Sequence, residues 1–171
     1  MNDITEGSTD GLDQRPEGFR RVTQVLAERG HAHAPLWLEV SARTCAEAAE
    51  ALQVQVGQIA KSVIFRRRAD EAAVLVVTSG DKRVDEKKVA AQVGAIGRAD
   101  AEFVKARTGF SIGGVSPVGH ALPPVVLVDR ELFRFNEIWA AAGHPNGVFR
   151  LAPDELVALT GAPVADVVVM S

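Results

Sequence analysis

The chain has 171 residues, of which 47% are hydrophobic and 24% charged, and its formal net charge is −3 at pH 7. This length suits one compact domain, and the composition is that of a globular protein, not of a disordered or fibrous one. The net charge gives no sign of a strongly basic nucleic-acid-binding protein. Because the sequence has no signal-peptide core and no apolar run long enough for a bilayer, we expect a cytoplasmic protein with no membrane partner.

The sequence begins with a polar stretch. Residues 1–16 are rich in Asp, Gly, Ser and Thr, so we predict a disordered N-terminal tail there. Residues 17–171 contain no internal repeat and no low-complexity tract. We therefore expect a single folded domain over that range.

Local signals predict the elements of this domain in chain order. Helical spacing and capping signals, among them the capping-box pair Thr44 and Glu47, predict helices. These helices cover residues 19–26, 45–52, 85–93, 101–107 and 153–159. Short apolar runs bounded by turn residues predict strands, which cover residues 36–40, 58–65, 73–78, 125–128, 137–142, 148–151 and 164–169.

Two of these strands are less certain in type than the rest. Residues 137–142 fit a strand or a helix, with the strand favoured, and residues 164–169 fit a strand or an extended tail. Residues 58–65 and 73–78 are joined by a short polar turn, which predicts a β-hairpin. Strands and helices do not alternate strictly along the chain. We therefore expect an α+β fold, in which helices flank a mixed β-sheet.

Lys61 is unusual because it lies inside an otherwise apolar strand. Lysine is almost never fully buried without a partner, and unusual ionisable groups concentrate at functional sites. Strict alternation places Lys61 on the same face as Ile59 and Val63. An edge strand, from which the lysine side chain reaches water, explains the residue equally well.

A glycine-rich segment follows the predicted helix at residues 101–107. It reads Gly113-Gly114-Val115-Ser116-Pro117. Paired glycines let the main chain approach a ligand closely, and their N–H groups suit an anion or a developing oxyanion. Considered alone, the segment is better explained as a structural turn. It matches neither the P-loop nor the dinucleotide-binding fingerprint.

A second loop, Gly143-His144-Pro145-Asn146-Gly147, lies between two predicted strands. His144 could bind a ligand or act as an acid or base, although a solvent-exposed loop histidine is the commoner outcome. The other histidines and the single cysteine, Cys45, lack the spacing of metal ligands. We therefore expect no metal site, and nothing in the sequence indicates a cofactor. Cys45 is expected to be a small core residue.

Together these segments resemble a known family. The lysine strand, the hairpin, the segment Asp85-Glu86-Lys87-Lys88-Val89 and the loop at residues 113–119 follow one another as in the YbaK and prolyl-tRNA-synthetase-associated editing-domain family. The resemblance covers residues 18–170. It implies a mixed β-sheet with flanking helices and a free-standing deacylase, which hydrolyses the ester of mischarged aminoacyl-tRNA in trans.

The resemblance also implies roles for individual residues. Lys61 corresponds to the catalytic lysine, and Ser62 to the hydroxyl residue beside it. The substrate-binding loop of the family corresponds to residues 113–117, and a later loop near the pocket includes Gly143 and His144. The implied partners are the 3′ acceptor end of aminoacyl-tRNA and, as a further candidate, an aminoacyl-tRNA synthetase.

The tRNA-contacting surface and the amino acid carried by the tRNA are less closely defined. Residues 61–107 contain 11 Lys or Arg and 7 Asp or Glu, which gives a modest basic face or an ordinary solvated surface. Residues 66–88 are the expected tRNA contact. Relatives that resemble cysteinyl-tRNA deacylases have an aspartate in the strand after the later loop, whereas this sequence has Val148-Phe149-Arg150. This departure counts against cysteinyl specificity and leaves the amino acid open, beyond its being small.

Two other functions remain open. A non-catalytic module that binds aminoacyl-tRNA or a synthetase would share the fold and the glycine loop, but the presence of Lys61 favours an enzyme. Schiff-base chemistry on a carbonyl metabolite, through the amine of Lys61, is the third possibility.

Overall fold

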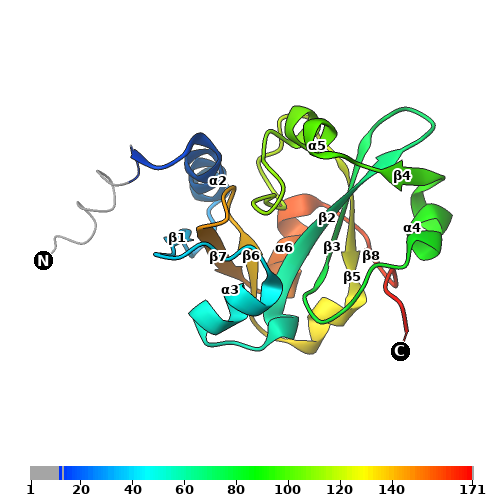
Figure 1. Cartoon of the computed structure of the whole chain (residues 1–171). Helices are drawn as coiled ribbons and strands as arrows, with labels where there is room; N and C mark the ends of the chain where they lie inside the picture. The colour runs from blue at the N-terminus through cyan, green and yellow to red at the C-terminus, as the bar shows by residue number, and fades with distance from the viewer. Residues whose placement is uncertain (1–11, 13, 171) are drawn as a thin grey trace, which may run out of the picture.

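The computed structural model describes residue 12 and residues 14–170, which form one mixed β-sheet with helices around it (Figure 1). The predicted tail at residues 1–16 lies mostly outside the described residues. The strand order is β1-β7-β6-β2-β3-β5-β8, and β4 pairs with β2. The strands are β1 Leu36–Trp37, β2 Ile59–Arg67, β3 Ala73–Ser79, β4 Ile96–Arg98, β5 Val125–Asp129, β6 Ile138–Ala141, β7 Gly147–Leu151 and β8 Val164–Ala165.

Five α-helices and two short 3₁₀ helices belong to the described part of the chain. The α-helices are α2 Glu17–Glu28, α3 Cys45–Leu52, α4 Glu86–Val93, α5 Ala101–Thr108 and α6 Pro153–Thr160. The 3₁₀ helices are η1 Val56–Gln58 and η2 Arg130–Arg134. Thr44 and Glu47 form the predicted capping box at the start of α3. The expected α+β fold with a mixed sheet is confirmed, because β2 pairs antiparallel with β3 and parallel with β6.

The sequence-based boundaries need several corrections. The strand expected at residues 36–40 ends at Trp37, because Leu38 and Ala42 donate main-chain hydrogen bonds to the loop at Asn146 and Pro145 instead. The predicted hairpin is confirmed, although β2 runs to Arg67. Strand β4 and helices η1 and η2 were not predicted, since each is too short to show a periodic pattern, and Gln58, expected in a strand, ends η1.

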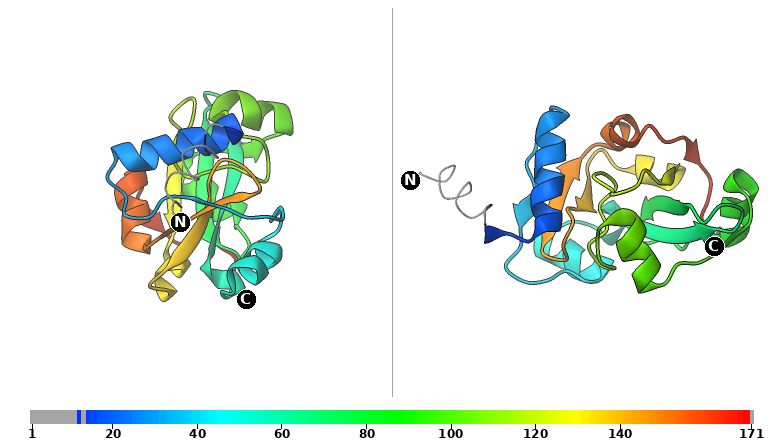
Figure 2. Two further views of the ribbon diagram at one scale, coloured as in Figure 1. Left: turned by 90° about the vertical axis from the view of Figure 1, so that its left-hand side faces the viewer. Right: turned by 90° about the horizontal axis from the view of Figure 1, so that it is seen from above.

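Alternating side chains of β2 and β3 build separate cores on the two faces of the sheet. Leu75 and Val77 belong to the core that α2, α5 and α6 cover. Val74 and Val76 pack with α4, and Ile59 packs with α3. Helices α3 and α4 therefore lie on one face of the sheet, near opposite ends of β2. The two turned views in Figure 2 show helices on both sides of the sheet.

Candidate active site

A pocket of about 310 Å³ opens beside the first half of β2. Its walls come from α3, from β6 and β7, from the glycine loop and from the loop that contains His144. Most of the wall is apolar, with Ala48, Ile59, Trp139 and Val148 among its side chains. Segments far apart in the sequence therefore meet in one cavity.

Lys61 lies at the border between this pocket and a second, more open hollow in front of α4. Its side chain is half-buried, and its Nζ donates a hydrogen bond to the carbonyl oxygen of Lys82 at 2.5 Å. Strand β2 is a central strand, with β3 on one side and β6 and β4 on the other. β2 is therefore not an edge strand as a whole, although Lys61 itself pairs only with Thr78 of β3, because β6 pairs with residues 59–60 and β4 with residues 65–67. A partly buried ammonium group is held by a main-chain carbonyl at the wall of a cavity.

Ser62 also lines the pocket. Its Oγ atom is buried and has no hydrogen-bond partner within the described residues. A buried hydroxyl without a partner costs free energy unless a ligand or a water molecule binds to it. Ser62 is thus equipped to bind a polar group that enters the pocket.

Only two residues of the glycine loop, Gly113 and Val115, line the pocket, whereas Gly114, Ser116 and Pro117 do not. Gly113, which has φ +95°, and Val115 line the cavity. Gly114 lies behind them, against the main chain of His144. Ser116 and Pro117 are buried and do not line the cavity. The N–H groups of Gly113 and Val115 have no acceptor among residues 12 and 14–170.

Hydrogen bonds within the protein hold Ser116 in place. Its Oγ accepts a hydrogen bond from the N–H of Val118 at 3.1 Å. Nε2 of His120 lies 2.6 Å from the Ser116 carbonyl oxygen and donates its N–H to it in the tautomer that is protonated on Nε2. Burial lowers the pKa of His120, in spite of that hydrogen bond. These contacts shape the loop and keep the Ser116 hydroxyl out of the cavity.

His144 also lines the pocket. Its Nδ1 accepts a hydrogen bond from the N–H of Asn146 at 3.0 Å, so the neutral ring carries its proton on Nε2. The ring packs on Trp37 with 4.9 Å between centroids. Burial, and secondarily the charge of Arg43, lowers the pKa of His144 and favours this neutral form. In this neutral form, Nε2 of His144 carries the N–H that the ring can donate.

Gly143 does not line the main pocket. It allows the loop that contains His144 to contact the start of α2. Its φ is +86°, and a Cβ atom there would lie 2.3 Å from the carbonyl oxygen of Gly18. Only glycine fits at this contact between α2 and the loop. Of the predicted site residues, Lys61, Ser62, Gly113, Val115 and His144 thus meet at the main pocket, and the others support it.

Sequence reasoning missed several pocket residues, of which Cys45 is the most distinctive. Cys45 was expected to be a small core residue. It packs, half-buried, against the core cluster around Ile59, and at the first turn of α3 it also lines the cavity. Burial raises the pKa of its thiol, and the nearby charge of Lys61 partly opposes that shift. Its position at a helix start was visible in the sequence, but the orientation of that helix was not.

Two further properties concern the described residues only. No three His, Cys, Asp or Glu side chains in them gather in a way that would hold a metal ion. No helix in the same part of the chain combines the length and hydrophobicity that a bilayer crossing requires.

Comparison with known proteins identifies relatives of this fold and site. Residues 39–159 match the family model described as the aminoacyl-tRNA editing domain. The uncharacterised protein YwhH of Bacillus subtilis (strain 168) is 39% identical over 119 residues, which are 69% of this chain and 75% of YwhH. EbsC of Enterococcus faecalis (strain ATCC 700802 / V583), provisionally assigned as a Cys-tRNA(Pro)/Cys-tRNA(Cys) deacylase, is 26% identical over 70% of this chain and 73% of its own.

A solved structure extends the similarity to nearly the whole chain. It is a crystal structure provisionally assigned as a trans-editing enzyme for prolyl tRNA synthetase, with 42% sequence identity and a TM-score of 0.85. The alignment covers 91% of this chain and 99% of that one. The family match and the shared fold agree with one another. This chain belongs to the aminoacyl-tRNA editing domain family.

Proposed function

We propose that this protein is a trans-editing hydrolase, which cleaves the ester bond of mischarged aminoacyl-tRNA carrying a small amino acid. The observation that carries the proposal is that Lys61 and the glycine loop line the same pocket. Each feature alone had a plain structural explanation. Their meeting in one cavity, in a chain of this family, favours a shared chemical task.

The pocket suits a small aminoacyl group. Its volume is about 310 Å³, and Ala48, Ile59 and Val148 bring apolar side chains to its wall. Size alone separates substrates weakly, by about 1–3 kcal/mol for each methylene group. The pocket would therefore exclude large side chains by steric clash, while small correct and incorrect amino acids would need a second means of discrimination.

Ester hydrolysis requires stabilisation of the negative charge that develops on the carbonyl oxygen. The N–H groups of Gly113 and Val115, which lack acceptors among the described residues, are suitable donors. Such a donor contributes about 3–4 kcal/mol to the transition state. The ammonium group of Lys61 would polarise the same carbonyl or bind the terminal phosphate. Lys61 acts in this scheme as an electrostatic group and not as a nucleophile.

Two further polar residues of the pocket, Ser62 and His144, would bind the substrate. The Oγ of Ser62 is buried without a partner, and Nε2 of neutral His144 is a donor. No Asp or Glu side chain occurs among the described residues that line the cavity. We therefore propose that the terminal ribose hydroxyl of the tRNA, and not a carboxylate, activates the attacking water.

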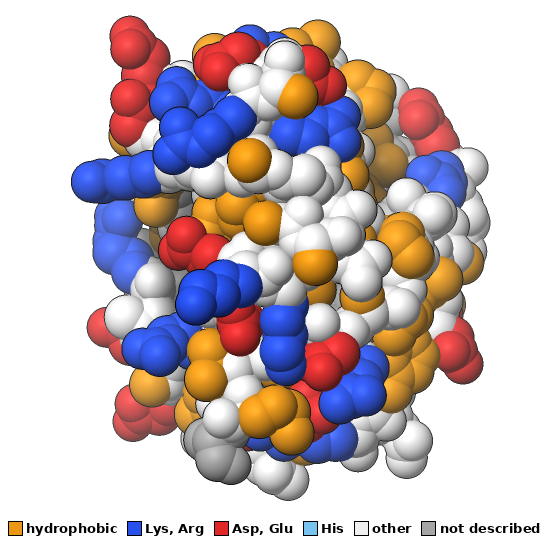
Figure 3. All heavy atoms as spheres, turned by 90° about the vertical axis from the view of Figure 1, so that its right-hand side faces the viewer, with side chains coloured by type: hydrophobic (Ala, Val, Ile, Leu, Met, Phe, Trp, Pro, Cys, Tyr) orange, Lys and Arg blue, Asp and Glu red, His pale blue; other side chains and the backbone are white. Residues whose placement is uncertain are grey.

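The tRNA would approach over the face that carries α4 and β4. Figure 3 shows Lys and Arg side chains spread over this side of the molecule, with Asp and Glu among them. Residues 66–88 belong to this region and include Arg83 and Lys87 at the hollow beside Lys61. A mixed surface of this kind predicts weak tRNA binding that declines with salt. The solved structure provisionally assigned as a trans-editing enzyme for prolyl tRNA synthetase suggests a synthetase of this kind as a partner. The two proteins would then act in the cytoplasm, where the tRNA is charged.

The proposal is tested with a panel of aminoacyl-tRNAs. Loss of ester is measured for each, with wild-type protein and with Lys61→Ala. We expect hydrolysis of one or a few small misacylated species and a decrease of about 100-fold or more in the variant, which should keep its circular-dichroism spectrum. Tight binding without hydrolysis of any panel member would instead identify a non-catalytic binding module. Borohydride trapping of a covalent adduct would indicate Schiff-base chemistry.

A further inference from the structure

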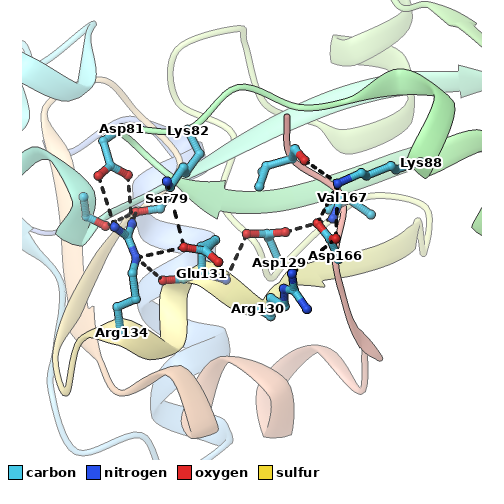
Figure 4. Close-up of polar contacts among 12 residues, drawn as sticks. Ser79, Asp81, Lys82, Lys88, Asp129, Arg130, Glu131, Arg134, Asp166 and Val167 are labelled. Atoms are coloured by element: carbon cyan, nitrogen blue, oxygen red, sulfur yellow. Dashed lines mark hydrogen bonds and ion pairs between the residues drawn. The ribbon is translucent and has the colours of Figure 1, made fainter. Parts of the chain in front are cut away.

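The turn that follows β3 is held in place by a cluster of charged side chains (Figure 4). Arg134, in η2, donates to Asp81 from Nη2 at 2.9 Å and from Nη1 at 3.3 Å. The same Nη2 atom donates to Oγ of Ser79 at 2.8 Å, and Nε donates to the carbonyl of Glu131 at 2.8 Å. One guanidinium group therefore ties the start of the turn to a helix from a distant part of the sequence.

This turn carries the acceptor for Lys61. The carbonyl oxygen that receives its Nζ belongs to Lys82, the residue directly after Asp81. The N–H of Lys82 donates to the carbonyl of Ser79 at 3.0 Å, which closes the turn. A displacement of Asp81 would consequently move the Lys82 carbonyl and the ammonium group bound to it.

The cluster also contacts the segment that leads into the lysine strand. Oγ of Ser79 donates to the carbonyl of Gly57, which lies in η1 just before β2. Gly57 has no room for a side chain, because a Cβ atom there would be 2.8 Å from the Phe135 ring. The Arg134 cluster thus contacts the segments on both sides of Lys61, the entry to β2 and the turn after β3.

A second group of contacts holds the far end of the same turn. The N–H of Val169 donates to the carbonyl of Arg83 at 2.8 Å, and Asp85 donates to the carbonyl of Val167 at 2.8 Å. The carboxylate of Asp129 accepts from Val167 N–H at 2.9 Å (Figure 4). The turn is therefore fixed at both ends. Beside Lys61 its side-chain contacts are those of Asp81 with Arg134 and the ion pair of Lys82 with Glu131 at 4.0 Å.

We infer that Arg134 and Asp81 are positioning residues, which set the place of the Lys61 ammonium group through the carbonyl of Lys82. The inference rests on the proposed hydrolase function. Neither residue lines the pocket, so they act through Lys61 and do not touch the substrate. The pair is partly exposed, with side-chain exposures of 36% and 40%, so we expect the protein to remain folded when the pair is removed, and the melting temperature measures any loss of stability.

The test compares kinetics and structure in matched variants. Asp81→Asn and Arg134→Met remove the pair, and Asp81→Glu retains its charge. Glu137→Gln breaks the Arg150–Glu137 pair, whose exposures of 41% and 42% are similar and which lies away from the pocket. For each variant, kcat, KM and the melting temperature are measured. The Lys61 ammonium signal is recorded by ¹⁵N NMR, with Lys61→Arg as the assignment control.

We expect Asp81→Asn and Arg134→Met to lower kcat by roughly 10- to 100-fold while KM stays unchanged, because a small displacement of a catalytic group has effects of this size. The double variant should lose no more than Arg134→Met alone, since both act through one contact. Asp81→Glu should recover part of the rate. The Lys61 ammonium signal, slowed in exchange by its hydrogen bond, should disappear in Asp81→Asn and persist in Glu137→Gln.

An unchanged kcat, or an equal decrease in Glu137→Gln, would overturn the inference. So would a Lys61 signal that persists in both Asp81→Asn and Arg134→Met. A wild-type protein that deacylates no member of the panel would instead refute the proposed function. In that case the NMR comparison alone decides whether the pair positions Lys61.

Discussion

Gly114 lies directly against the main chain of His144. A Cβ atom on Gly114 would be 2.7 Å from the Cα and 2.9 Å from the N of His144. The glycine loop and the histidine loop are therefore in main-chain contact behind the pocket, and residues on either side of this contact line it. The geometry of the site depends on the absence of one side chain.

Gly114→Ala should impair both stability and deacylation. Because the clash is with main-chain atoms, one loop must move, and overpacking of this kind costs about 1–3 kcal/mol. The displaced loop would carry Gly113 and Val115 away from the substrate. Chemical denaturation and single-turnover deacylation measure the two effects.

Gly161→Ala is the matched control for this substitution. Gly161 has φ +67° and no atom within 4 Å of an added Cβ, so alanine there introduces only conformational strain, about 1–2 kcal/mol. It ends α6, away from the pocket. We expect a similar loss of stability with normal activity. Equal activity in Gly114→Ala and Gly161→Ala would show that the contact with His144 does not support the site.

The pH dependence of deacylation should report on His144. Burial lowers its pKa, so the neutral ring persists below the ordinary histidine value of about 6.5. Once protonated, Nδ1 would carry a hydrogen and lose its bond from the Asn146 N–H. We expect a rate that is independent of this group above about pH 6.5 and declines only below it.

His144→Asn separates this titration from other effects of acid. An asparagine at this position can accept the same N–H in an Asx turn, and it does not titrate. The variant should be slower at neutral pH, since it lacks the Nε2 donor, but the acid decline should vanish from its pH–rate profile. A decline at the same pH in the variant would exclude His144 as its cause.

His120 should make the folded protein less stable in mild acid. Burial lowers its pKa in the folded state, so the unfolded chain binds a proton more readily. The stability contributed by the neutral ring is therefore complete above about pH 6.5 and decreases as the pH falls toward the lower folded-state pKa. Urea denaturation between about pH 7.5 and pH 5 measures this loss.

His120→Gln tests that assignment. The glutamine amide can still donate to the carbonyl of Ser116 but cannot take up a proton. We expect its stability to depend less on pH over this range than that of the wild type. Identical pH dependence in the two proteins would show that His120 does not control acid stability.

The proposed role of the terminal ribose is tested with a modified substrate. A tRNA whose terminal adenosine lacks the 2′-hydroxyl and carries the amino acid on the 3′-oxygen should resist hydrolysis, because the lining described here offers no carboxylate to act as a base. Binding should be retained. Undiminished turnover of this substrate would require another group to activate the water.

Much of the fold was predictable because its signals are local. The capping box at Thr44 and Glu47 needs only residues three apart, and the β2–β3 hairpin follows from two apolar runs around a polar turn. The same reasoning missed β4, whose three residues pair with the far end of β2. It also extended β1 too far, because the partner of residues 38–42 is a loop that local patterns do not reveal.

The site was predictable in part. Lys61 stood out as a charge in an apolar strand, and the paired glycines stood out by composition. Ser116 was as prominent in the sequence as Gly113, yet its hydroxyl turns inward to the N–H of Val118. Which atoms of a loop face a cavity depends on its packing against other segments, and here Gly114 and Gly143 determine that packing.

The sequence by itself determined most of the elements, the class of the fold and two of the segments that line the pocket, since these follow from residue type and short-range spacing. Only the tertiary structure decided what Lys61 contacts. Its partner is a main-chain carbonyl, which leaves no trace in residue identity, and the turn that presents this carbonyl is bound through Asp81 by Arg134 from another part of the chain. Such an arrangement is set by the relative positions of whole elements, and therefore appears only once the chain is folded.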